Sequence, residues 1–191
     1  MFRTSLVVAA ALCMLAPCER AVAATYVTEP THTFVTFEIP HFGTSTIRGR
    51  FDKTTGTVEF DPAAKTGKAE IAIDMASLNT GIEPFNRHMQ GKEFFDAAHF
   101  STAKFTAGKF VFDGDKVSRV VGMLTLVGKT MPVTLRATNF NCYESPLFKR
   151  EVCGGDFETR IQRSQWGITY GLDHGFPDAV RLLIQIEALK Q

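Results

Sequence analysis

The chain lacks a hydrophobic run long enough to cross a bilayer as a helix. Its longest apolar stretch, residues 6–15, has ten residues, whereas a membrane-spanning helix needs about 20. Arg3 precedes this stretch and small residues follow it, among them Ala21, Ala23 and Ala24. This order is typical of a secretory signal peptide. We therefore predict that residues 1–24 are removed on export, after Ala23 or Ala24, and that the mature protein is soluble.

The predicted mature chain also lacks net charge. Removing 24 of the 191 residues leaves 167, with 19 basic and 19 acidic side chains. No basic patch is present, so nucleic acid and anionic membrane surfaces are not expected as partners. A chain of this length fits a single domain, residues 25–191, with a core of its own.

Cysteine is scarce after export. Cys13 and Cys18 fall within the predicted signal peptide, which leaves Cys142 and Cys153. Exported proteins meet an oxidising compartment, so we interpret this isolated pair as a disulfide. Closing so short a loop should stabilise the fold by about 3 kcal/mol.

Motifs for catalysis are missing as well. The chain has no G-x-S-x-G element and no pair of carboxylates spaced as acid and base. One metal hypothesis stays open, because His32, His41 and His88 could meet at one end of a barrel and bind an ion such as zinc. Their spacing matches no known ligand pattern, however, and hydrogen-bonded structural histidines are the preferred interpretation. We expect neither an enzyme nor a cofactor.

What the chain has in abundance is alternation of apolar and polar residues with period two. It runs through residues 33–41, 47–51, 57–61, 68–75, 103–105, 109–113, 117–127, 131–140, 157–161, 168–170 and 180–188. So many sequential strands, with no alternation of helices and strands, predict an all-β fold closed into an antiparallel barrel. An eight-stranded barrel can be filled by side chains or can hold one elongated ligand.

Residues 77–100 interrupt this pattern with a short helical insert. Pro84 suits the first turn of a helix, and Gly91 can end it. Four large apolar side chains lie in or directly after this helix: Phe85, Met89, Phe94 and Phe95. They could plug the end of the barrel, or they could form the gate of a ligand pocket.

Four segments, which follow one another in the same order as in the family, resemble the YceI-like family of periplasmic polyisoprenoid-binding proteins. They are residues 32–41 with 48–51, residues 74–80 with 87–89 and 93–96, the G-x-L-T element of residues 122–130 with 132–133, and residues 163–168. The resemblance covers nearly all of the mature chain. The chain departs from the family pattern in the loop between Cys142 and Cys153 and in residues 174–178.

The resemblance implies a periplasmic, eight-stranded antiparallel lipocalin-like β-barrel, without catalysis and without stable membrane insertion. The barrel would enclose a long polyisoprenoid, such as the tail of an isoprenoid quinone or a polyprenyl phosphate, or another long-chain lipid or similar amphiphile. From their apolarity we expect these residues to line the cavity: Phe37, Ile39, Phe51, Ile71, Ile73, Phe105, Leu124, Leu126 and Trp166. The insert would supply the gate. A ligand-free stress or interaction protein with a packed core is the main alternative, a histidine-based metal enzyme is the second, and a homodimer stays open.

Overall fold

The computed structural model describes residues 23–191. The predicted signal peptide, including Cys13 and Cys18, lies outside them except for Ala23 and Ala24. The strands are β1 Ala24–Thr28, β2 Phe34–His41, β3 Ser45–Phe51, β4 Thr54–Asp61, β5 Thr66–Asp74, β6 Leu78–Asn79, β7 Thr102–Asp113, β8 Lys116–Leu126, β9 Lys129–Glu144, β10 Glu151–Gln162 and β11 Ala179–Lys190. The helices are α1 Glu83–Gln90 and the 3-10 turns η1 Met75–Ser77, η2 Arg163–Trp166 and η3 Leu172–His174.

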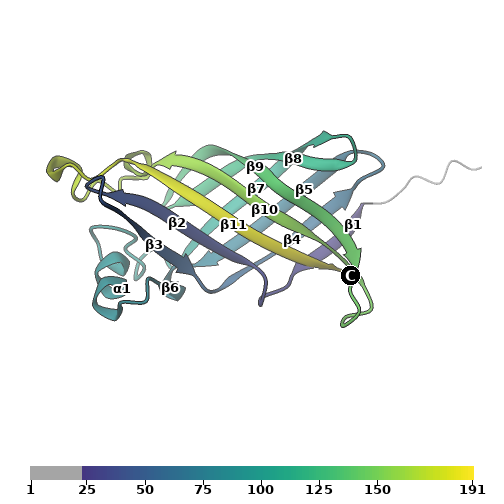
Figure 1. Cartoon of the computed structure of the whole chain (residues 1–191), viewed down its shortest axis with the longest axis horizontal. Coiled ribbons are helices and arrows are strands. Elements are labelled where there is room, and N and C mark those ends of the chain that lie inside the picture. The colour runs from purple at the N-terminus through teal and green to yellow at the C-terminus, as the bar shows by residue number, and fades with distance from the viewer. Residues whose placement is uncertain (1–22) are drawn as a thin grey trace, which may run out of the picture.

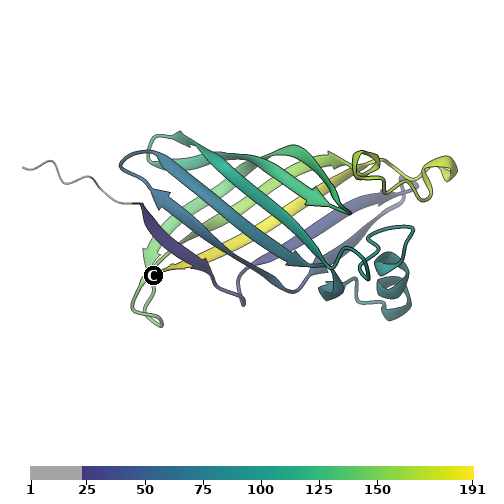
Figure 2. The same cartoon turned by 180° about the vertical axis from the view of Figure 1, so that it is seen from behind.

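The strands close into an antiparallel barrel (Figures 1 and 2). Strand β11 completes the circle, because one part of it pairs with β1 and another part with β2, while β10 lies along its opposite edge. Strands β1 and β2 thus act as one interrupted strand, and β3 and β4 act as another. With each interrupted pair counted once and the short β6 set aside, eight strands form the wall. The predicted eight-stranded barrel is confirmed.

The two ends of the barrel differ in what covers them (Figure 1). The helix end carries α1, the turn between β2 and β3, and the loop 163–178. The terminal end carries the chain's last residue, Gln191, and the loop that joins β9 to β10. At this end Cys142 and Cys153 face each other across β9 and β10 and form the predicted disulfide.

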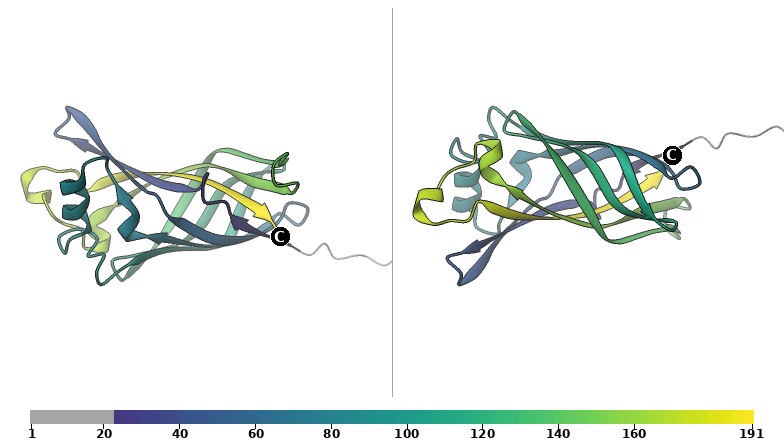
Figure 3. Two further views of the ribbon diagram at one scale, coloured as in Figure 1. Left: turned by 90° about the horizontal axis from the view of Figure 1, so that it is seen from below. Right: turned by 90° about the horizontal axis from the view of Figure 1, so that it is seen from above.

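The wall is fully paired at the terminal end but not at the helix end. Strand β3 pairs with β2 along its whole length, yet its other edge pairs only with β6, through Arg50 and Phe51. Figure 3 shows the β2–β3 hairpin diverging from the rest of the wall at this end. Residues 75–101, including α1, occupy the interval between β3 and the start of β7. The helical insert therefore lies where the wall is incomplete.

Local sequence signals explain α1. Pro84 lies in its first turn, where a missing N–H is harmless, and Gly91 caps its C-terminus by donating its backbone N–H to the carbonyl of His88. Arg87 forms an ion pair with Glu83 one turn earlier, at 2.9 Å. The predicted helix is confirmed: it ends before Gly91 as predicted, and it begins at Glu83, one residue before Pro84.

Two strand predictions were wrong. Residues 168–170 form a turn between η2 and η3, because Gly167 and Gly171 adopt the left-handed region, with φ of 84° and 77°. Residues 103–105 and 109–113 are one continuous strand, β7, in which the pairing with β8 shifts between Ala107 and Lys109. A bulge thus replaces the predicted break.

The outer surface carries a network of charges across the wall. Glu38 on β2 pairs with Arg48 and Arg181, and Glu158 on β10 pairs with Arg181 and Arg136. The hydrogen bond from Arg48 is the main cause that lowers the pKa of Glu38 below its ordinary value. This network ties β3, β2, β11, β10 and β9 together across the outside of the barrel.

Candidate functional site

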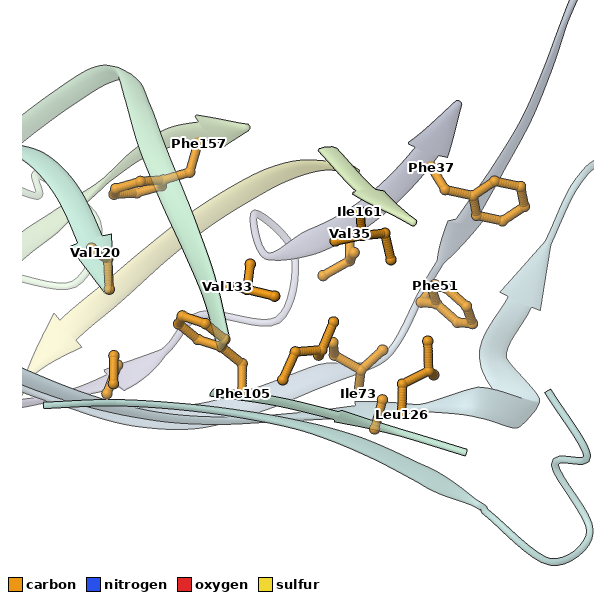
Figure 4. Packing of buried hydrophobic residues seen from close by; sticks show 14 of the residues in the cluster. Val35, Phe37, Phe51, Ile73, Phe105, Val120, Leu126, Val133, Phe157 and Ile161 are labelled. Carbon is orange, nitrogen blue, oxygen red and sulfur yellow. The ribbon is translucent and has the colours of Figure 1, made fainter. Parts of the chain in front are cut away.

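Two apolar cavities lie end to end inside the barrel. The inner cavity, toward the terminal end, has a volume of about 120 Å³, and the outer cavity, toward the helix end, has about 370 Å³. Four residues line both cavities: Val35, Ile73, Leu124 and Leu182. We call these four the neck. Figure 4 shows Val35 and Ile73 between Phe157 on the inner side and Phe37 on the outer side.

Eight of the nine residues predicted as lining belong to these walls. The inner cavity is lined by Ile71, Ile73, Phe105 and Leu124, and the outer one by Phe37, Ile39, Phe51, Ile73, Leu124 and Leu126. Trp166 lies outside both linings. It is only 1% exposed, and its indole N–H donates to the backbone carbonyl of Leu124 at 3.2 Å. Trp166 thus contacts the backbone of β8 and belongs to the buried core without lining either cavity.

Alternation along each strand explains which side chains face inward. On β2, Val35, Phe37 and Ile39 point to the interior, one residue in two. Opposite Phe37, Gly49 leaves room for the aromatic ring, because a Cβ added there would lie 2.4 Å from it. The prediction missed several inner-cavity residues, among them Phe60, Phe110, Phe140 and Phe157. They lie on predicted strands, but nothing in the sequence distinguished their face from the opposite one.

The insert closes the outer cavity on one side. All four predicted gate residues, Phe85, Met89, Phe94 and Phe95, line it. Phe85 and Met89 are one helical turn apart on α1, so they face the same way. The ring of Phe95 meets that of Phe51 on β3 at a centroid distance of 5.5 Å. The insert thus contributes its apolar face to the cavity wall.

The lining of the outer cavity also includes polar side chains. His41, His88, Arg163 and Tyr170 are all part of its lining. Tyr170 is 45% exposed, so the cavity reaches solvent there, and its ring lies 5.3 Å from that of His88. Among the described residues that line the two cavities, none is an aspartate or a glutamate.

Arg163 is buried, with only 6% of its surface exposed. Its Nε donates to the carbonyl of Pro177 at 3.0 Å, and its Nη1 donates to the carbonyls of Ile168 and Tyr170 at 3.1 and 2.8 Å. Burial lowers the pKa of the guanidinium, and the nearby Asp178 opposes this effect. An arginine remains charged in proteins all the same. The sequence gave no sign of this role, because the three carbonyls come together only in the folded loop 163–178.

The three histidines of the metal hypothesis do not form one site. His41 and His88 line the outer cavity, whereas His32 lies between β1 and β2 and contacts Glu29 through Nδ1 at 2.6 Å. Within residues 23–191, no group of three or more histidine, cysteine, aspartate or glutamate side chains could hold a metal ion. No helix in this part of the chain is long and apolar enough to cross a membrane.

Comparison with known proteins agrees with this architecture. A "UPF0312 protein" of Vibrio vulnificus strain YJ016 is 33% identical over 192 residues, which cover 99% of this chain and 100% of the relative. The crystal structure of Burkholderia cenocepacia BcnA is 25% identical with a TM-score of 0.69, covering 84% of this chain and 98% of that one. A polyisoprenoid binding domain from Saccharophagus degradans shares the fold, at 18% identity and a TM-score of 0.63, covering 88% and 99% of the two chains. The YceI-like domain family matches residues 26–188. By this match, and by the architecture described above, the chain belongs to the YceI-like family.

Proposed function

We propose that this protein is a periplasmic binding protein that encloses the apolar chain of a polyisoprenoid, or of a similar long amphiphile, inside the barrel. The observation that carries this proposal is the pair of cavities whose linings share the four neck residues. Most of the residues that line them are apolar, from Phe140 in the inner cavity to Phe85 of α1 in the outer cavity. A long, narrow and apolar space suits an extended hydrocarbon chain better than a compact polar metabolite.

The energetics favour enclosure. Each methylene-sized group that leaves water gains about 0.8 kcal/mol, so an isoprenoid chain is strongly driven into such a space. Membership of the YceI-like family supports the proposal. The Saccharophagus degradans neighbour is described as polyisoprenoid binding, and at its low identity it lends support through the shared barrel alone.

We assign the gate to the insert. Phe85 and Met89 on α1, with Phe94 and Phe95 after it, cover the outer cavity where β3 lacks a full partner strand. Displacing this short segment would uncover the cavity without breaking the ladders between β7, β8, β9 and β10. In this proposal no residue acts as a catalyst.

Native mass spectrometry of the purified protein, followed by organic extraction, tests the proposal. A bound lipid of isoprenoid mass, released on denaturation, is the expected result. A bare polypeptide mass, with no uptake of added prenyl alcohol, would instead favour the packed, ligand-free barrel. A stoichiometric metal adduct would favour the enzyme alternative.

A further inference from the structure

An aromatic cluster lies at the terminal end of the inner cavity, where Phe60 on β4 pairs with Ala24 at the start of β1. Four other rings surround Phe60, with centroids 5.6 to 6.4 Å from its own: Tyr26, Phe110, Phe112 and Phe140. All but Phe112 belong to the lining of the inner cavity. The five residues come from four strands, β1, β4, β7 and β9, and we call them the aromatic plug.

The rings of the plug are held in place by their neighbours. Gly67 on β5 pairs with Phe60, and a Cβ added at Gly67 would lie 2.4 Å from the ring of Phe110, so this ring fills the space beside the glycine. The hydroxyl of Tyr26 donates a hydrogen bond to the carboxylate of Glu151. Phe60 and Tyr26 are each only 3% exposed. Rings packed as closely as this leave a ligand no passage beyond them.

The volumes of the two cavities indicate how much hydrocarbon the barrel can hold. An apolar cavity of about 150 Å³ holds the six carbons of benzene, which is about 25 Å³ per carbon. By this measure the inner cavity of about 120 Å³ holds about five carbons, and the outer cavity of about 370 Å³ holds about fifteen. An isoprene unit has five carbons. The two cavities together therefore have room for about four isoprene units.

We propose that the aromatic plug limits the enclosed ligand to about four isoprene units, or about 20 carbon atoms. The inference rests on the proposed function and specifies the length of its ligand. A chain that passes Ile73 at the neck ends at the plug, so every unit beyond the fourth stays at the helix end, where Tyr170 is 45% exposed. Leaving one five-carbon unit in water weakens binding on the order of a thousandfold.

Three prenyl alcohols test this limit on the wild-type protein: farnesol, geranylgeraniol and geranylfarnesol, with three, four and five isoprene units. They are offered together, in equal amounts, in phosphatidylcholine vesicles. The alcohols extracted from the repurified protein are then quantified by mass spectrometry. A fully enclosed chain exchanges one apolar environment for another, so farnesol and geranylgeraniol should be bound within about tenfold of each other. Geranylfarnesol should be bound at least tenfold less than geranylgeraniol, because its fifth unit stays in water.

Two results would overturn the length limit while the binding function stands. The first is uptake of geranylfarnesol within tenfold of geranylgeraniol, which would mean that the plug does not stop the chain. The second is exclusion of geranylgeraniol together with geranylfarnesol, which would mean that the chain ends before the neck. If none of the three alcohols is bound, the proposed function itself fails.

The variant Phe110→Ala assigns the limit to the plug. It removes a six-carbon ring from the lining and so makes room for about one further isoprene unit. Geranylfarnesol should then be bound within about tenfold of geranylgeraniol. Val111→Ala is the matched control, because Val111 follows on the same strand, points to the opposite face and is absent from both linings. Exclusion of geranylfarnesol that persists in Phe110→Ala, or that is lost in Val111→Ala as well, would refute the assignment.

Phe110 also packs against Phe60, so its replacement could unfold the protein. If circular dichroism shows that Phe110→Ala does not fold, Phe140→Ala takes its place, because Phe140 lines the same cavity and contacts Phe60 from β9. The same gain in geranylfarnesol is expected, and its absence counts against the plug. The selection that the wild type makes among the three alcohols decides the length limit in either case.

Discussion

Ile73 offers the sharpest test of whether the barrel interior is a cavity or a packed core. Its side chain is 8% exposed and lines both cavities at the neck. The substitution Ile73→Trp places a large ring where a bound chain would have to pass. The two interpretations of the interior then predict opposite changes in stability and in binding.

The expected changes in the free energy of unfolding follow from the cavity volume. At roughly 24 cal/mol per Å³ of empty apolar space, the inner cavity of about 120 Å³ corresponds to about 3 kcal/mol. A ring that enters this space should therefore leave the free energy of unfolding unchanged or raise it by up to that amount. A ring forced into a filled core would instead lower it by roughly 1 to 3 kcal/mol.

Binding provides the second readout. Each five-carbon isoprene unit kept out of the inner cavity would lose about 4 kcal/mol, at ~0.8 kcal/mol per carbon, which is on the order of a thousandfold in Kd. We expect Ile73→Trp to weaken binding of geranylgeraniol by that order, measured by titration calorimetry, while urea unfolding shows no loss of stability.

Ala72→Trp is the matched control. Ala72 lies one residue away on β5, so its side chain points to the opposite face, and it is absent from both linings. Its replacement should leave the affinity unchanged. If Ile73→Trp destabilises the protein while the wild type takes up no prenyl alcohol, the interior is a packed core and the binding proposal is wrong.

Four further predictions concern stability, cavity shape and metal content. Replacing Cys142 and Cys153 by serine should lower the free energy of unfolding by about 3 kcal/mol; an unchanged urea midpoint would contradict this. The pKa of Glu38 is lowered in the folded protein, so its contribution to stability is complete above the ordinary value of 4.5 and is lost as the pH falls through the lower folded value. In Glu38→Gln the free energy of unfolding should therefore fall less steeply as the pH is lowered. An identical pH profile would rule this out. Gly49→Ala should push the ring of Phe37 into the outer cavity, weakening prenyl binding at a cost of about 1 kcal/mol in stability, and adding Phe37→Leu should restore binding. Elemental analysis after dialysis should find no equimolar transition metal, whereas a retained one would revive the enzyme alternative.

The sequence predicted best those features that depend on neighbours along the chain. Pro84 and Gly91 mark the two ends of α1 because capping is decided within one turn of a helix. Strand alternation identified most of the wall, since burial on one face of a sheet repeats every second residue. The disulfide followed from the small number of cysteines. Strand β1 was missed because its residues do not alternate in polarity: Val27 is exposed, whereas the polar Thr28 is buried.

Features that depend on tertiary structure could not be predicted from the sequence. Trp166 is as apolar as the predicted lining residues, and only the folded structure shows that it lies outside both linings and donates its indole N–H to the carbonyl of Leu124. Arg163 resembles any arginine at the end of a strand until the loop 163–178 folds back and presents its carbonyls. The separation of His32 from His41 and His88 likewise depends on where β2 crosses the barrel.

The incomplete pairing of β3 implies that the two halves of the barrel open with different free energies. At the terminal end β1 has a partner on both edges and a covalent bond joins β9 to β10, whereas Ser45–Gly49 of β3 pairs only with β2. Backbone amides of β3 and the insert should therefore exchange hydrogen with solvent through local fluctuations, well below the free energy of global unfolding. The rate at which a ligand enters the barrel would then be set by this local opening alone. Evolution could adjust that rate without altering the melting temperature of the protein.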